Sequence, residues 1–428
     1  MSLNLPQSGR VVVIDDHPEE VLPLMKVLSK GRISVNYFTG KKEELPEVPF
    51  LDVRLVFLDI VLEGAEGTDD KTKLSMATGV IKRIIHRNNG PFILAVWTKH
   101  KELIKGIEGR LKGENYQPIV TDLQKYEFKD SKGDNKYDFL QIEKKLKEKL
   151  KNLGIFEIFI LWENMVYNSS SSVVNEFSRF VEFNDSWNDK LKQIFYKLAE
   201  AWASKRLNNN SSQDIIRNAF FTFGGIFADT FEKNIHQEPE ESYNQMDFSS
   251  LESEVEKVVK GKINSRLLVD RSQLDGLYPG NVYENNRKTH IKESLNTGND
   301  MKIEEEIKNK SIPVIIEVSP LCDFVQDKMK LSRIVEGFLC PVEVQINGTT
   351  IQTYKELKSS THFLYISPVI EHEEKLYRLV IDFRYFSANS IDEINESTPI
   401  FRLRKDILID IQTKLSSHIN RPGVLFVE

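Results

Sequence analysis

The sequence has very little cysteine, no long hydrophobic run and no excess of positive charge. Only Cys322 and Cys340 occur in 428 residues, too few for a disulfide framework, which predicts a reducing, cytoplasmic location. No apolar run approaches the roughly 20 residues of a membrane-spanning helix, and the N-terminal residues do not resemble a signal peptide. The net charge of -6 gives no argument for binding to nucleic acid or to an anionic membrane.

Strand and helix signals alternate over the first 130 residues. Short apolar runs rich in branched residues predict strands, and apolar residues at helical spacing between them predict helices. This alternation predicts an α/β fold with a doubly wound sheet of five parallel strands. Residues 63–75 are polar and contain glycine, which predicts an unusually long loop. The predicted strands lie at 10–14, 34–38, 55–58, 92–98 and 117–122, and the predicted helices near 18–30, 80–85 and 103–111.

Polar residues follow these strands at their C-terminal ends. Asp15 and Asp16 follow the first strand, Asp59 the third, and Thr98 ends the fourth, while Lys125 follows the fifth. Parallel strands share one C-terminal edge, so these residues can converge there. Three clustered carboxylates would raise each other's pKa unless a cation neutralised them, and all-oxygen ligands suit Mg²⁺. A hydroxyl and an amine beside them suit a phosphoryl group, which one carboxylate could accept as an aspartyl phosphate.

In this order and spacing, the residues resemble the receiver domain of two-component response regulators. The resemblance covers roughly the first 130 residues and implies a flavodoxin-like fold. It implies that Asp59 accepts a phosphoryl group from a histidine kinase or a phosphotransfer protein. Asp16 would bind Mg²⁺ directly, Asp15 would bind it through water, and Asp59 and the carbonyl group of Val61 would be further ligands.

The resemblance also implies that Thr98 and Lys125 contact the phosphoryl oxygens. The sequence departs from the family pattern beside the lysine, where Tyr126 stands in place of the usual proline, and at Asp122, where the family usually has an aromatic residue. A pseudo-receiver that keeps the acids without accepting phosphate is therefore an alternative. His17, next to the acids, is interpreted as a surface residue of the first helical turn, or as one that tunes the site.

The rest of the chain changes in character. Three domains are predicted: a receiver domain at 1–130, a helical connector or bundle at 131–272, and a β-rich domain at 273–428. In the middle domain, the apolar run 155–166 predicts a buried helix that is broken by four serines at 169–172. Helical patterns are also present near 139–150, 187–205, 213–235 and 251–268, and their aromatic residues, among them Trp202, Phe220 and Phe221, are predicted to be core.

The last domain favours strands. Turn signals at Asn347-Gly348 and at 371–374 predict hairpins, and strand count and spacing predict a small, largely antiparallel sheet or barrel. The predicted strands lie at 313–319, 336–346, 362–369 and 377–383, followed by a helix at 405–419.

A second candidate site lies in this domain. Cys322 and Asp323 follow a predicted buried strand, and His362 and Cys340 occur further along the chain. A cysteine–histidine nucleophile or a zinc site could be built from these residue types. Their spacing matches no known motif, however, and inert cysteines are the competing interpretation.

These observations predict a phosphorylation-controlled regulator whose C-terminal regions give output by partner binding or assembly. The alternatives are a phosphate sink or scaffold without output, and a C-terminal effector enzyme. No catalysis is predicted beyond receiver-type phosphotransfer and autodephosphorylation. The expected partners are a histidine kinase or phosphotransfer protein and an effector protein or a second copy of the chain, but neither nucleic acid nor a membrane. Receivers with unfamiliar C-terminal regions also resemble components of phosphorelay-based phage defence.

Overall fold

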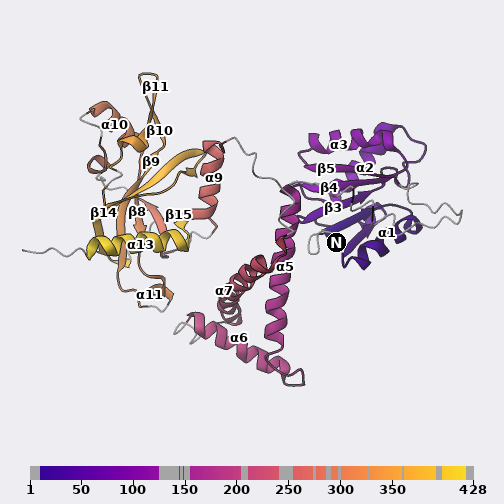
Figure 1. Cartoon of the computed structure of the whole chain (residues 1–428), viewed down its shortest axis with the longest axis horizontal. Helices are drawn as coiled ribbons and strands as arrows, with labels where there is room; N and C mark the ends of the chain where they lie inside the picture. The colour runs from indigo at the N-terminus through magenta and orange to yellow at the C-terminus, as the bar shows by residue number, and fades with distance from the viewer. Residues whose placement is uncertain are drawn as a thin grey trace, which may run out of the picture. The chain divides into compact units, whose positions relative to one another are not determined.

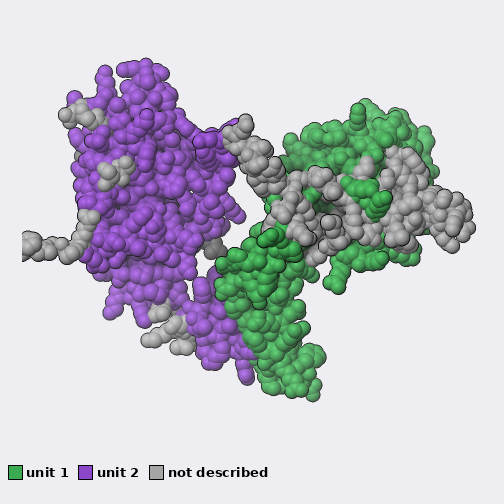
Figure 2. Space-filling model, in the orientation of Figure 1, with its two compact units in different colours: residues 1–191, 223–250 green, residues 192–222, 251–428 purple. Residues whose placement is uncertain are grey.

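The computed structural model describes most of the chain in two compact units. These comprise residues 1–191 with 223–250, and residues 192–222 with 251–428 (Figure 2). None of the helices in the described part is long and apolar enough to cross a membrane. The predicted division into three domains stays a prediction. The described residues are 10–124, 144, 148, 155–203, 211–240, 254–272, 276–285, 291–296, 300–325, 328–358, 361–391 and 398–420.

A five-stranded, all-parallel sheet forms the centre of the first unit (Figure 1). Its strand order, β2-β1-β3-β4-β5, is that of flavodoxin-like folds. Every residue of β4 is buried, as expected for a strand with helices on both sides. The predicted α/β architecture is therefore confirmed. The strands are β1 (Arg10–Ile14), β2 (Val35–Phe38), β3 (Val53–Leu58), β4 (Phe92–Thr98) and β5 (Pro118–Gln124).

Helices cover both faces of this sheet. Side chains of α1 and α5 pack with Val11 and Phe57 on one face, and side chains of α2 and α3 pack with Val12 and Leu94 on the other. The sheet is therefore the middle of three layers. The helices are α1 (Pro18–Lys30), α2 (Asp70–Ile84), α3 (Ile104–Gly113) and α5 (Ile155–Ser178), and two short 3-10 helices are η1 (Lys42–Glu44) and η2 (Lys101–Leu103).

Helix α2 begins earlier than the sequence predicted. The loop was expected to run to residue 75, but the helix starts at Asp70. Asp69 is its N-cap, and the Asp69 carboxylate accepts a hydrogen bond of 2.7 Å from the amide of Thr72. This cap satisfies an amide that the first turn leaves without a helical partner. The prediction missed the start because the first turn is polar and shows no apolar spacing.

Helix α5 runs unbroken for 24 residues, so the break predicted at the four serines was wrong. Ser169 is buried, and its hydroxyl donates to the carbonyl of Met165 at 2.7 Å. A serine that bonds its own preceding turn can remain in a helix. The same hydroxyl oxygen accepts a hydrogen bond of 2.7 Å from the Asn234 amide of α7 (Ser212–Gln237).

The first turns of α5 belong to the core of the parallel sheet. Phe156 and Ile160 are 2% and 1% exposed and lie in the same apolar cluster as α1. Further along the helix, Glu163 receives three hydrogen bonds from Arg54 of β3, Nε to Oε1 at 3.0 Å, Nε to Oε2 at 3.1 Å and Nη2 to Oε1 at 2.7 Å. A guanidinium bound through two nitrogens fixes geometry better than a single contact. Residues from beyond the predicted receiver thus complete its sheet.

Two further helices were predicted almost to the residue, but their aromatics were not. Helix α6 (Trp187–Ala203) and helix α7 form as continuous helices. The prediction that Phe220 and Phe221 are core was wrong, because they are 58% and 49% exposed. In the second unit, the helices pack around Ala199, Ala203 and Ala219, with Phe195, Leu198 and Ile215 partly buried against them.

An eight-stranded antiparallel sheet organises the second unit, which confirms the predicted β-rich region. Its strand order is β12-β14-β9-β8-β7-β15-β6, with β13 paired to β14. The strands are β6 (Val269–Asp270), β7 (Asn281–Glu284), β8 (Ile312–Glu317), β9 (Ser332–Pro341), β12 (Leu364–Ile366), β13 (Ile370–His372), β14 (Lys375–Asn389) and β15 (Pro399–Leu403). Beside them, β10 (Glu343–Ile346) and β11 (Thr349–Gln352) form a separate hairpin.

Short helices cover this sheet. Helix α13 packs Ile411 and Leu415 into one apolar cluster, and α10 contributes Ile307 to another. The helices are α9 (Lys257–Leu268), α10 (Met301–Lys310), α11 (Leu321–Val325) and α13 (Lys405–Ile419), with the 3-10 helices η5 (Ile291–Ser294) and η6 (Thr353–Glu356).

Both predicted hairpin turns occur. Asn347 and Gly348 have φ angles of 50° and 79° between β10 and β11, and Glu373 and Glu374 have φ angles of 48° and 62° between β13 and β14. Positive φ at both central residues matches the twist of two-residue hairpins. The second turn adopts this conformation without the glycine or asparagine that usually favours it.

Candidate functional site

The acidic residues at the ends of β1 and β3 leave the sheet side by side. Ile14 and Leu58 are in register across the two strands. Directly beyond them, the amide of Asp59 donates to the carbonyl of Ile14 at 2.8 Å, and the amide of Asp15 donates to the carbonyl of Phe38 at 3.1 Å. Asp15 is fully buried and Asp59 is 7% exposed. The structure therefore brings Asp15 and Asp59 to the same edge of the sheet, as predicted.

Asp59 is held in a defined orientation by the end of β4 and by its own loop. The Thr98 hydroxyl donates to Asp59 Oδ1 at 3.1 Å, and the amide of Val61 donates to the same oxygen at 3.2 Å. Thr98 is fully buried, and its Oγ1 accepts a hydrogen bond of 3.2 Å from the amide of His100. A hydroxyl and an amide N–H are both donors that can also stabilise the oxygens of a group attached at this carboxylate.

Asp15, Asp16 and His17 form a cluster of potential metal ligands. One ligand atom from each lies within 4.8 Å of the others, and within the described ranges no other group of three or more such residues does so. The amide of His17 donates to Asp15 Oδ1 at 2.9 Å, and His17 Nδ1 lies 3.1 Å from Asp16 Oδ1. Carboxylate oxygens are ligands that Mg²⁺ prefers, so the side chains of Asp15 and Asp16 are suited to the predicted ion.

His17 takes part in this cluster although its side chain is 46% exposed. Burial alone would lower the pKa of His17, but the charge and hydrogen bond of Asp16, with the charges of Asp15 and Glu20, outweigh it and leave the pKa raised. The imidazole of His17 thus interacts electrostatically with these carboxylates. Both interpretations of His17, as a surface residue and as one that tunes the site, stay predictions.

Tyr37 is a neighbour of the site that the sequence did not single out. Its hydroxyl donates to the carbonyl of Asp15 at 2.7 Å, and it sits on β2 opposite Val13. Burial, followed by the negative charge of Asp15, raises the pKa of Tyr37 to about 12. The phenol therefore stays protonated and remains a donor that fixes the backbone at the acidic pair. Its place as the penultimate residue of a short strand was the available signal.

The remaining predicted receiver residues lie at or beyond β5. Thr98 is in register with Gln124, the last residue of β5, whereas Lys125 and Tyr126 lie outside the described residues. Asp122, at the position that the family usually gives to an aromatic residue, lies 3.9 Å from Lys101 Nζ through Oδ2. An acidic side chain thus stands where the resemblance implies an aromatic one.

The speculative C-terminal site is not drawn together in the same way. Cys322 is exposed, and its Sγ lies 3.7 Å from Asp323 Oδ1. Asp323 pairs with Arg333 at 3.6 Å, and the His362 ring lies 6.0 Å from the ring of His418. Within the described ranges, these residues form no cluster of three metal ligands. The nucleophile or zinc site stays a prediction without a geometric argument.

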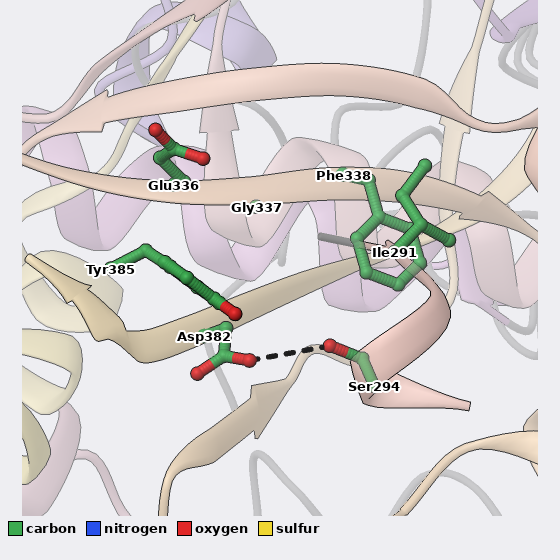
Figure 3. A pocket seen from close by; sticks show the side chains of 7 residues that line it. All are labelled: Ile291, Ser294, Glu336, Gly337, Phe338, Asp382 and Tyr385. Atoms are coloured by element: carbon green, nitrogen blue, oxygen red, sulfur yellow. Dashed lines mark hydrogen bonds between the residues drawn. The ribbon is translucent and has the colours of Figure 1, made fainter. Parts of the chain in front are cut away.

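A small pocket marks an irregularity between β9 and β14. Residues 382–385 of β14 lie between Ile381, opposite Gly337, and Phe386, opposite Val335, so they face Glu336 alone. In Figure 3, Asp382, Tyr385 and Glu336 surround the resulting hollow, and the Ser294 hydroxyl donates to Asp382 Oδ2 at 3.4 Å. Arg384 neutralises Asp382 through a contact of 2.6 Å. The pocket is therefore built around an ion pair and offers no comparable set of reactive groups.

Glu317 is the most deeply buried acid of the second unit. It is fully buried at the end of β8. Its carboxylate oxygens each accept from the amide of Ser319 at 3.2 Å, and Oε1 accepts from the Ser332 hydroxyl at 3.2 Å. Among the described residues, no Lys or Arg forms an ion pair with it. Burial raises the pKa of Glu317, against the effect of these hydrogen bonds.

This raised pKa predicts a specific pH dependence of stability. The contribution of Glu317 is fully present below the ordinary carboxyl pKa of about 4.3 and is lost as pH rises through the raised folded value. Glu317→Gln cannot ionise, so its free energy of unfolding relative to the wild type should increase between about pH 4 and about pH 7. Urea unfolding across this range measures the difference.

Glu343→Gln is the matched control for this prediction. Hydrogen bonds from Gln352 and Lys257 lower the pKa of Glu343, so the free energy of unfolding of this variant relative to the wild type should fall as pH rises toward the ordinary carboxyl pKa of about 4.3 and should stay constant between about pH 5 and about pH 7. A Glu317→Gln variant whose stability parallels that of the wild type at every pH would contradict the assignment.

The comparisons with known proteins add no family to these observations. The chain matches no model of a known protein family, and no curated protein matches it either. The N-terminal sheet with its helices is compatible with a flavodoxin-like fold. What the site does must accordingly be argued from its own geometry.

Proposed function

We propose that the N-terminal region accepts a phosphoryl group on Asp59 from a histidine kinase or phosphotransfer protein in a Mg²⁺-dependent reaction. The C-terminal regions would then give output by partner binding or assembly. The single observation that carries the proposal is the Thr98–Asp59 hydrogen bond of 3.1 Å at the sheet edge where Asp15 also ends its strand. Residues at the ends of three strands, far apart in sequence, lie at this edge.

The chain's own groups can serve each part of such a transfer. A carboxylate oxygen of Asp59 would form the new P–O bond while the P–N bond of a phosphohistidine donor breaks and its imidazole takes up a proton. The Thr98 hydroxyl and the Val61 amide, which now bind Asp59 Oδ1, are placed to donate to the phosphoryl oxygens. Tyr37 holds the backbone of the acidic pair in place.

The acidic pair is the part of the site that would bind a cation. Asp15 and Asp16 both present carboxylate oxygens, which suit a hard ion that retains some of its water. Mg²⁺ bound there would neutralise the charge of the incoming phosphoryl oxygens. Asp15 and Asp16 would be its ligands, and the carbonyl oxygen of Val61, in the same loop as Asp59, would be a third ligand.

One observation favours a second candidate, a phosphate sink or pseudo-receiver scaffold without output. Asp122 lies where the receiver resemblance implies a switching aromatic, and it is paired with Lys101 rather than packed on the site. Without that aromatic, phosphorylation of Asp59 would have to change the structure by another route. A labelled protein with unchanged hydrodynamic behaviour and unchanged association would support the sink.

Chelation of divalent cations tests the proposal directly. The full chain is incubated with acetyl phosphate or phosphoramidate in Mg²⁺ and, in parallel, in EDTA, and the intact mass is followed over time. We expect labelling in Mg²⁺ and a loss of rate of at least about tenfold in EDTA, because the ion stabilises developing charge by several kcal/mol.

Adding Mg²⁺ in excess of the chelator should restore the rate of labelling. Equal labelling with and without Mg²⁺, or no labelling with either donor, would contradict the proposed function.

A further inference from the structure

Helix α9 packs against the C-terminal sheet through its small and polar side. Gly261 and Ser265 are its buried residues, and a Cβ at Gly261 would lie 2.5 Å from Leu376 Cδ2. The Ser265 hydroxyl donates to the carbonyl of Glu371 at 3.1 Å, and Asn264 Nδ2 donates to the carbonyl of Val369 at 2.8 Å. The inward face of this helix is therefore mostly small and polar, and its apolar contact with the core comes from Leu268 at its C-terminal end.

Its outward face is aliphatic. Val259, Ile263 and Leu267 follow each other at intervals of four residues and are 42%, 49% and 64% exposed. Val255, just before the helix, is also 49% exposed. A surface helix normally turns its apolar side to the core and its polar side to water. Helix α9 does the reverse, and exposed apolar rows of this kind mark interaction sites.

Two positive charges accompany this row. Lys262 and Arg266 are both exposed on α9, and neither forms an ion pair within the part of the chain that the structure describes. The other two lysines of the helix are already neutralised, Lys257 by Glu343 at 2.9 Å and Lys260 by Glu254 at 3.2 Å. The outward face thus combines an aliphatic row with two uncompensated cations.

We infer that this face of α9 binds an amphipathic helix of a partner protein, with acidic residues beside its apolar row. A row at intervals of four is the ridge that interdigitates with the same ridge of another helix at a crossing angle of about −50°. The cations require acidic flanks on the partner. This inference does not depend on phosphorylation of Asp59, since α9 lies wholly in the second unit.

The same residues argue against two other occupants. If two copies of α9 met in antiparallel fashion about Ile263, Lys262 would lie next to its own copy, and the like charges would repel. A lipid surface would gain only a short aliphatic row without aromatic residues, and two cations give weak attraction to anionic headgroups.

A synthetic helical peptide with leucine at every fourth position and glutamate beside each leucine serves as the probe. Its binding to the full chain is measured by fluorescence anisotropy. We expect Ile263→Glu to weaken binding by at least about tenfold, because an isoleucine that the complex would bury is replaced by a charge. Ile409→Glu is the matched control, since Ile409 is 47% exposed on α13 of the same unit, and it should leave binding unchanged.

Charge reversal tests the second half of the inference. The double variant Lys262→Glu with Arg266→Glu should no longer bind the glutamate peptide. It should bind instead a peptide that has lysine in place of glutamate. Binding of both peptides to the wild type with equal affinity would overturn the proposed chemistry, as would no binding of either.

Further experiments test the two other binding partners, a membrane and a second copy of the chain. Capture of the wild type but not Ile263→Glu by phosphatidylserine vesicles would overturn the inference in favour of a membrane. A dimer in sedimentation that Ile263→Glu dissolves would overturn it in favour of a second copy. Asp59→Asn should bind the glutamate peptide like the wild type, so failure of this inference and failure of the proposed function are separable.

Discussion

Replacement of Asp59 by asparagine is expected to abolish phosphoryl labelling of the chain. The side chain keeps its size and an oxygen that can accept from Thr98 Oγ1, now 3.1 Å from Asp59 Oδ1, so the site should stay packed. An amide, however, is not a nucleophile that forms a stable acyl phosphate. The intact mass after incubation with acetyl phosphate and Mg²⁺ is the measurement, with hydroxylamine to release an acyl phosphate from the wild type.

Asp70→Asn is the control for this experiment. Asp70 is an exposed acid at the first position of α2, in the same unit but outside the site. This variant should label like the wild type. Label retained by Asp59→Asn would move the phosphoacceptor elsewhere, and label lost from Asp70→Asn would point to a general effect of neutralising acids.

Gly337→Ala is expected to destabilise the second unit strongly. A Cβ at Gly337 would overlap the carbonyl oxygen of Val380 and lie 3.3 Å from Ile381 Cα, both of them backbone atoms of β14. No rotamer change relieves a backbone contact, so β9 and β14 would have to separate beside the pocket. Overpacking of well-packed sites costs about 1 to 3 kcal/mol, and we expect at least about 2 kcal/mol here. Urea unfolding followed by circular dichroism measures the loss.

Gly224→Ala is the matched glycine substitution. Gly224 lies within α7, and a Cβ there would have no atom within 4 Å. Alanine is favoured over glycine in a helix by about 1 kcal/mol, so this variant should be slightly more stable than the wild type. Equal effects of the two substitutions would show that the backbone contact at Gly337 is not the cause.

The parts of the fold that sequence predicted well are those fixed by local pattern. Branched apolar runs that end in Asp15 and Asp59 became buried parallel strands, because only the interior of a sheet accepts such runs. Their shared edge follows from strand direction, so the meeting of these acids with Thr98 could be predicted. The hydrogen bonds that orient Asp59 could not, because they depend on the loop through Val61.

The parts that sequence predicted poorly depend on what an element packs against. The serines at 169–172 were interpreted as a break, yet Ser169 is satisfied by Met165 and Asn234 inside the bundle. Phe220 and Phe221 have a core composition but lie at the surface. The orientation of α9 could not be predicted from the sequence either. Periodicity shows that one side of a helix is apolar, but it does not show which side faces the sheet.

Helix α5 has a consequence for how this chain can be rearranged during evolution. Phe156 and Ile160 seal the parallel sheet, and the same unbroken rod reaches Asn234 of α7 through Ser169. Recombination that moved only the five strands and the helices between them into another gene would leave out Phe156 and Ile160. The apolar face of the sheet that these residues cover would then be exposed. A transplanted module must therefore extend at least to Glu163, which binds Arg54 of β3, and its new host would also receive the first turns of α5.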